Sequence, residues 1–192
     1  MDEAIGRLLA ALEETDQANN TLVLFMTDHG GDPRYGGSNE PLRGGKATLY
    51  EGGLRVPCLA RWPGVTTPGT QSDSIVTMLD MYPTLAEIIG FPTHHDDLHG
   101  QSFLPVLRGE SPTQHKPIVW ATGSHAELDR QSWVAVRDGV WKWIAAPNKS
   151  PELFRLDRDP LEQHDVSADY PGVAKRLARM AELGATGETF PR

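Results

Sequence analysis

The chain contains little cysteine and little positive charge, and each shortage excludes some functions. Its 192 residues include one cysteine, Cys58, which excludes an internal disulfide and a cysteine-rich zinc site. Lysine and arginine number 18, against 26 aspartates and glutamates, so the net charge is -8. This balance excludes nucleic acid as an expected partner, and an anionic substrate would have to be bound by local positive charge.

Long apolar runs are also missing, and no stretch approaches the length of a transmembrane helix. The N-terminal segment MDEAIGRLLAALEE is acidic and amphipathic, unlike a signal peptide. These features do not indicate a compartment. The content of 39% apolar and 23% charged residues is typical of a globular protein, and the length suits one domain or one domain with a small annex.

The first half of the chain has the pattern of an α/β protein. Leucines and an isoleucine at helical spacing predict a helix over 2–18. The runs at 21–26 and 56–60 are short and continuously apolar, which is typical of strands buried on both faces. Asp80 is the expected N-cap of a helix through Ile89. We therefore predict a mostly parallel sheet with flanking helices.

The pattern of predicted secondary structure changes after about residue 110. Four short strands and a final amphipathic helix predict a small antiparallel α+β subdomain, at 118–122, 132–139, 140–146, 152–157 and 171–183. The expected division of the chain is therefore 1–112 and 113–192. Trp133, Trp141 and Trp143 are predicted to pack between this sheet and its helix.

The strongest chemical signal is a loop that follows the first predicted strand. Asp28 and His29 stand where α/β sheets bind ligands, and Gly30-Gly31 allows close backbone approach. Asp28 can bind a hard divalent cation, and Lys46, preceded by two glycines, suits a tetrahedral oxyanion. A cation and a lysine together can neutralise a sulfate or phosphate ester. The alternative is that Asp28 caps a turn and His29 is a surface residue.

The motifs TDHGG and NEPLRGGKATLYEGGLRVP resemble the sulfatase signature of the alkaline-phosphatase-like superfamily, and later motifs extend the resemblance over nearly the whole chain. The resemblance to arylsulfatases implies that Asp28 and His29 bind a divalent metal, usually Ca²⁺. It implies that Lys46 binds the sulfate and stabilises charge in catalysis, and that Glu51 and Arg55 form a buried pair. The family commonly has Asn at the position of His29, and imidazole suits Mn²⁺ or another divalent metal better than Ca²⁺.

The nucleophile of this family is a formylglycine made in a Cys-x-Pro-x-Arg type motif, and this chain has no such motif. Cys58, in CLARW, lacks the arginine and is interpreted as a core cysteine. The resemblance therefore implies the C-terminal part of a sulfatase catalytic domain, with the N-terminal half missing. Alone, such a chain is expected to be incomplete and inactive.

The predicted function is a sulfuric ester hydrolase that acts on a small-molecule or sugar sulfate ester. One alternative is a phosphodiester or phosphonate monoester hydrolase of the same superfamily. Another is a non-catalytic module that binds sulfate or glycans. The segment HHDDLH at 94–99 is expected to be a solvated loop rather than a second metal site.

Overall fold

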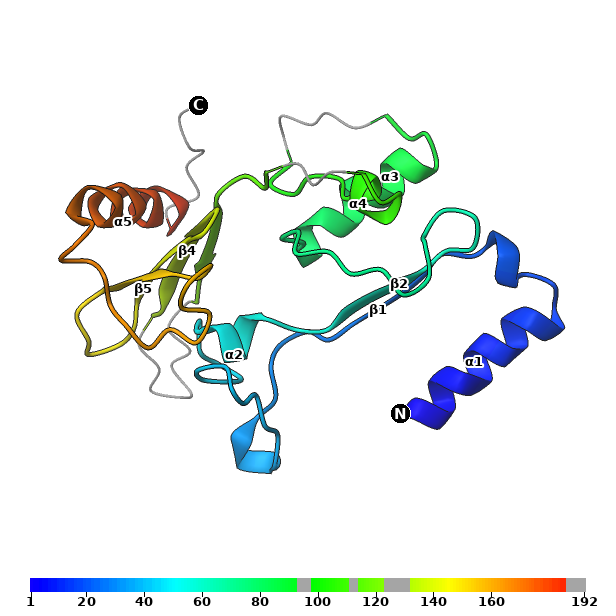
Figure 1. Cartoon of the computed structure of the whole chain (residues 1–192), viewed down its shortest axis with the longest axis horizontal. Helices are drawn as coiled ribbons and strands as arrows, with labels where there is room; N and C mark the ends of the chain where they lie inside the picture. Colours follow the sequence, from blue (N-terminus) through cyan, green and yellow to red (C-terminus); the bar gives the residue numbers. More distant parts are fainter. Residues whose placement is uncertain (93–97, 111–113, 123–131, 186–192) are drawn as a thin grey trace. The chain divides into compact units, whose positions relative to one another are not determined.

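The computed structural model describes residues 1–92, 98–110, 114–122 and 132–185 (Figure 1). The chain forms two compact units, one from Met1–Met26 with Pro57–His115 and the other from Thr27–Val56 with Lys116–Arg192. The loop that contains Asp28 and Lys46 therefore belongs to the same unit as the C-terminal part of the chain. The predicted domain division after residue 112 stays a prediction.

The first unit contains most of the helices predicted from the sequence. Its elements are α1 (Asp2–Glu14), η1 (Ala18–Asn20), β1 (Val23–Met26), β2 (Cys58–Arg61), η3 (Met78–Asp80), α3 (Met81–Ile88) and α4 (Leu104–Leu107). A cluster of Phe103, Leu104 and Leu107 forms its core, with residues of β1 and α3 packed against it. None of the helices in the described parts of the chain has the length and apolar character needed to cross a membrane.

The two strands of this unit pair antiparallel, from Val23 opposite Arg61 to Met26 opposite Cys58. The sequence predicts a mostly parallel sheet, whereas these two runs pair antiparallel with each other. A continuous apolar run indicates burial, and it contains no information about the direction of the neighbouring strand. β1 is only half-buried and β2 is largely exposed, with Leu59 62% accessible. On α3, Tyr82 and Leu85 are exposed as well.

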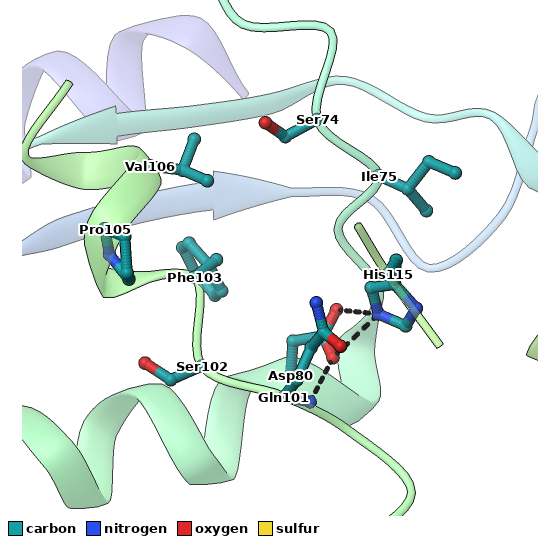
Figure 2. Close-up of a pocket in the computed structure, with 9 residues that line it drawn as sticks. All are labelled: Ser74, Ile75, Asp80, Gln101, Ser102, Phe103, Pro105, Val106 and His115. Atoms are coloured by element: carbon teal, nitrogen blue, oxygen red, sulfur yellow. Dashed lines mark hydrogen bonds and ion pairs between the residues drawn. The ribbon is translucent and has the colours of Figure 1, made fainter. Parts of the chain in front are cut away.

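Asp80 holds the first unit together, in a role that differs from the predicted one. It does not cap α3 through its side chain. Its carboxylate instead accepts the Thr77 amide at 2.6 Å, in a capping box at the start of η3. The His115 ring lies 3.0 Å from the same carboxylate, and the Gln101 amide donates to it at 2.8 Å. Figure 2 shows the contacts of Asp80 with His115 and Gln101 beside a small pocket, and they join three separate stretches of chain.

The Asp80 carboxylate stays charged although it is only 1% exposed. Burial acts to raise its pKa, but the hydrogen bonds from the His115 ring and from two backbone amides outweigh that effect, and the pKa is lowered. Thr84 extends the network, because its hydroxyl donates to the Asp80 carbonyl and accepts the Phe103 amide. α4 is thereby tied to α3 at the edge of the core.

The second unit is built on a four-stranded antiparallel sheet in the order β3-β4-β5-β6. Its strands and its long helix fall where the sequence predicts them, at β3 (Ile118–Ala121), β4 (Val134–Asp138), β5 (Trp141–Ala145), β6 (Glu152–Arg155) and α5 (Pro171–Ala185). Gly139, with φ of 56°, makes the tight turn between β4 and β5 that RDG predicts. The loop of this unit adds η2 (Pro33–Tyr35) and α2 (Glu51–Leu54).

Both faces of this sheet are covered, each by a different part of the chain. Alternate residues such as Val136 and Leu153 pack against Leu177 of α5. The opposite face, with Ala135, Ile144 and Phe154, packs against Leu49 and Tyr50 of the loop. Figure 1 shows α5 running alongside the strands.

The three tryptophans divide between these two faces. Trp141 and Trp143 pack in the α5 cluster, as predicted. Trp133 lies on the other face, where its ring meets the Tyr50 ring edge-on at a centroid distance of 5.4 Å. The predicted location of Trp133 is therefore wrong, because it packs against the loop and not against the helix.

The Asp80 network generates a prediction about stability and pH. We expect Asp80→Asn to lower the free energy of unfolding at pH 7 by roughly 1–3 kcal/mol, because an amide cannot accept all the donors that face it. The folded-state pKa of Asp80 lies below 3.8, so its contribution is present above that pH and is lost as the pH falls further. The difference between wild type and variant should therefore shrink below about pH 4.

Chemical denaturation of both proteins across pH would measure this difference. Asp73→Asn is the matched control, since Asp73 is exposed in the same unit and its replacement should change the free energy of unfolding by less than about 0.5 kcal/mol. An Asp80→Asn variant as stable as wild type at pH 7 would contradict the structural role.

Candidate functional site

Asp28 and His29 lie directly beyond the end of β1, and their side chains face each other. Nε2 of His29 is 3.1 Å from Oδ2 of Asp28. The Asp28 side chain is 82% exposed and that of His29 is 38% exposed, so both can reach a ligand from solvent. The structure thus brings the two predicted metal ligands together.

The His29 ring is oriented by its own backbone. Nδ1 lies 2.9 Å from the Gly30 carbonyl oxygen, and because a carbonyl only accepts, Nδ1 carries the hydrogen. Nε2 is then the nitrogen that can bind a cation, and it points at the Asp28 carboxylate. Histidines that bind metals commonly donate the other ring nitrogen to such an oxygen. The pair therefore fits a divalent cation as two of its ligands.

Close packing of glycines fixes the backbone after His29. The Gly30 amide donates to the Gly53 carbonyl at 3.0 Å. A Cβ atom on Gly30 would lie 1.8 Å from the Gly52 carbonyl oxygen, so only glycine fits here. Asn39 fastens the next residue, because its side chain accepts the Gly31 amide at 2.6 Å and donates to the Gly31 carbonyl at 2.8 Å.

Lys46 lies on an exposed turn that is tied to the same glycines. Its amide donates to the Gly31 carbonyl at 3.1 Å, so its backbone adjoins the Asp28-His29 loop. The turn closes with the Thr48 amide donating to the Gly45 carbonyl at 3.0 Å. Ala47 has φ of 69°, an unusual conformation for a residue other than glycine. The surrounding contacts must hold this turn, and it presents the Lys46 ammonium to solvent.

Asp32 and Arg34 form a separate pair in this loop. Arg34 donates to Asp32 through two nitrogens, at 3.0 and 2.7 Å. This hydrogen bonding lowers the pKa of Asp32 to about 2. The Asp32 carboxylate is thus charged and already bound, which separates it from the freely exposed Asp28.

Glu51 is buried, but its partner differs from the predicted one. Its carboxylate lies 2.8 Å from Nζ of Lys142, a β5 residue with no exposed surface. The same ammonium lies 2.8 Å from the Glu162 carboxylate, which is also fully buried. Arg55 is exposed. The predicted pair of Glu51 with Arg55 is therefore wrong, because a lysine 91 residues away takes that place.

The charges of Glu51, Lys142 and Glu162 are buried, so each needs a partner of opposite sign. Burial raises the pKa of Glu162, and the nearby Lys142 ammonium opposes that rise. The Glu162 carboxylate also accepts the Glu51 amide at 2.7 Å, which satisfies a donor at the first turn of α2. Arg137 stands 3.7 Å from the other Glu51 oxygen. Each charge in the cluster thus has at least one partner of opposite sign.

Arg43 makes a second connection between the loop and the sheet. Its guanidinium lies 3.2 Å from Glu152 and stacks 3.8 Å from the centre of the Tyr50 ring. The Tyr50 hydroxyl donates to Glu152 at 2.7 Å, and burial followed by this hydrogen bond raises the pKa of Tyr50. The loop is therefore fixed to β6 by charge and by aromatic packing.

Cys58 lies on β2 with an exposed side chain, so its interpretation as a core cysteine is wrong. Partial burial nevertheless raises the pKa of the thiol, which disfavours the reactive thiolate. Neither its sequence context nor its environment suits a nucleophile.

Within the described residues, no three side chains of His, Cys, Asp or Glu gather as a complete metal site. His94, His95, Asp96 and Asp97 of the HHDDLH segment lie outside the residues that the structure describes. The sequence motif indicates Asp28, His29 and Lys46. It gives no signal for Lys142 or Glu162, which contact Glu51 from 91 and 111 residues away in the sequence.

Comparison with known proteins now adds to this geometry. Residues 1–91 match the family model described as Sulfatase. Steryl-sulfatase of Mus musculus is 42% identical over 161 residues, which cover 79% of this chain and 26% of that protein. The chain belongs to the sulfatase family. Human N-acetylgalactosamine-6-sulfatase is similar over 95% of this chain and 41% of its own length, at 29% identity.

Solved structures show the fold that this sulfatase chain adopts. The crystal structure of Ps i-CgsB in complex with k-i-k-neocarrahexaose superposes with a TM-score of 0.85 at 33% identity, over 94% of this chain and 40% of that chain. With further sulfatases and a phosphonate monoester hydrolase among the matches, the fold is alkaline-phosphatase-like, as predicted. This chain spans about a third of the length of the curated relatives that it matches.

Proposed function

We propose that this chain forms part of a sulfuric ester hydrolase of the arylsulfatase type. The observation that carries the proposal is the connection between two chemical groups. The Asp28-His29 pair and Lys46 lie on one loop and are joined through the hydrogen bond from the Lys46 amide to the Gly31 carbonyl. A cation site next to an ammonium suits an anionic, tetrahedral ester group such as a sulfate ester.

A divalent metal would be held by Asp28 and His29, with Ca²⁺ proposed first and Mn²⁺ as the alternative because of the imidazole. When bound, such a cation neutralises negative charge on the nonbridging oxygens of the ester. Among the residues that the structure describes, the recorded partner of the Asp28 carboxylate is His29. The remaining ligands would come from outside the 192 residues.

Lys46 is proposed to bind the sulfate group and to stabilise the charge that grows as the S–O bond breaks. A compact ammonium on an exposed, tightly held turn is suited to this work, since it can approach an oxyanion without steric hindrance. The nucleophile, a formylglycine by the family resemblance, would also lie outside this chain.

The proposed substrates are sulfate esters of small molecules or sugars. The matched relatives include steryl-sulfatases, and one solved structure contains BT4656 with its substrate D-glucosamine-2-N,6-O-disulfate, at 26% identity to this chain. The phosphonate monoester hydrolase of Agrobacterium radiobacter, at 24% identity, is similar in fold. A likeness of fold alone does not favour a phosphonate ester as the substrate of this chain.

Lys46 provides the direct test. In the complete enzyme, we expect Lys46→Ala to lower kcat on an aryl sulfate by about 10²–10³, because the lysine acts on charge that develops in the transition state. Lys46→Arg should also be poor, since a planar fork does not replace a compact ammonium. Steady-state kinetics would separate kcat from KM.

Lys175→Ala is the control for this measurement, because Lys175 is an exposed lysine on α5. If Lys46→Ala kept kcat and raised only KM, Lys46 would assist binding without catalysing. If Lys46→Ala had the kcat and the KM of wild type, the proposed function of this loop would fail.

Asp28 provides a test that does not depend on turnover. In the complete protein, Asp28→Ala should reduce the Ca²⁺ or Mn²⁺ content per chain, measured by elemental analysis after dialysis against the metal. In metal-loaded crystals, an Asp28 oxygen should lie about 2.3–2.6 Å from the ion. Asp32→Ala is the matched control, since the Asp32 carboxylate is held by Arg34. An unchanged metal content in Asp28→Ala would exclude Asp28 as a ligand.

The 192 residues alone should not hydrolyse sulfate esters, because they supply two metal ligands and no Cys-x-Pro-x-Arg motif. Exposed apolar side chains on β2 and α3 should also make the isolated chain prone to aggregate. Turnover of a chromogenic aryl sulfate would be measured with added Ca²⁺ or Mn²⁺. Metal-dependent turnover that Lys46→Ala abolishes would contradict the external nucleophile, and anion binding without turnover would support a binding module.

A further inference from the structure

The segment that carries Lys46 is attached at both ends to one distant residue. At its start, the Arg43 guanidinium donates to the Glu162 carbonyl at 2.9 Å. At its end, the Glu51 amide donates to the Glu162 carboxylate at 2.7 Å. Lys46 lies between these two attachments, and Glu162 is more than 110 residues away from each in sequence.

Glu162 is built to stay in one place. It is 1% exposed, and its backbone has a left-handed conformation, with φ of 56°, that residues other than glycine rarely adopt. The buried Lys142 ammonium lies 2.8 Å from both the Glu162 and the Glu51 carboxylates. The surrounding contacts therefore hold Glu162 against its backbone preference, and such strain is concentrated at functional positions.

The attachment also reaches the proposed metal ligands. Glu51 is followed by Gly52 and Gly53, and the Gly53 carbonyl accepts the Gly30 amide at 3.0 Å. Gly30 is packed so closely on Gly52 that no side chain could stand between them. A shift of Glu51 would consequently be transmitted to the backbone that immediately follows Asp28 and His29.

We propose that Glu162 is a positioning residue for Lys46: its carbonyl and its carboxylate hold the two ends of the 43–51 segment, and thereby set where the ammonium stands. This inference rests on the proposed function of Lys46. Glu162 itself is too deeply buried to touch substrate, so it acts through the loop. Small displacements of a catalytic group can lower a rate strongly even when binding is little changed.

The test uses the complete enzyme and an aryl sulfate substrate. Glu162→Ala removes the acceptor for the Glu51 amide, and we expect kcat to fall by at least about tenfold with a smaller change in KM. Glu162→Gln keeps an oxygen that can accept that amide, and it should restore kcat to within about threefold of wild type. Arg176→Ala is the control, because it breaks an ion pair with Asp138 elsewhere in the same unit.

A double-mutant cycle shows whether the effect passes through Lys46. Combined with Lys46→Ala, the Glu162→Ala change should lower kcat little further, since the group that it positions is already gone. Equal fold-losses in the two backgrounds would overturn the proposal, as would normal kcat in a folded Glu162→Ala enzyme. Near-ultraviolet circular dichroism would confirm folding.

Should Glu162→Ala fail to fold, Arg43→Met tests the other attachment with the apolar stem retained. The Arg43→Met enzyme should show the same loss of kcat and the same dependence on Lys46. A normal kcat in this variant would overturn the proposal. The proposed function has a separate failure, because it falls if Lys46→Ala alone leaves the rate of sulfate hydrolysis unchanged, whatever Glu162 does.

Discussion

The buried ammonium of Lys142, held between the carboxylates of Glu51 and Glu162, is the interaction on which the second unit depends. A charge with no solvent contact is tolerable only when partners surround it, and removing one partner of such a group typically costs about 3–5 kcal/mol. The cluster forms on the face of the sheet opposite α5. The loop that carries the candidate site is therefore the second cover of this sheet, and its conformation is part of the core.

The sequence predicts most of the local structure, because periodicity and turn residues act over short distances. The strands from 118 to 155 and the helix at 171 are confirmed to within two residues at each end. Asp28, His29 and Lys46 could be named as well, since the glycines around them form a recognisable motif. The structure adds the geometry, namely that the His29 ring faces Asp28 and that Lys46 is joined to Gly31.

What sequence reasoning misses are the pairings over long distances. The direction of β2 against β1 depends on the path of the intervening chain, which an apolar run does not encode. The family resemblance implies Arg55 as the partner of Glu51, whereas the fold supplies a lysine 91 residues later. Glu162 stands in the stretch RDPLEQHD, where a buried glutamate in a left-handed conformation looks like any surface acid.

The separation between loop and anchor has a consequence for how the protein is made. Residues 27–56 leave the ribosome well before residues 142–162, and until then the 43–51 segment has neither of its attachments. Contacts between residues more than 110 positions apart, such as Glu51 with Glu162, require the closure of a long loop, which slows folding. The candidate site is thus assembled late, after the sheet to which it is fastened. Until residues 142–162 have been made, the loop that carries Lys46 has no anchor.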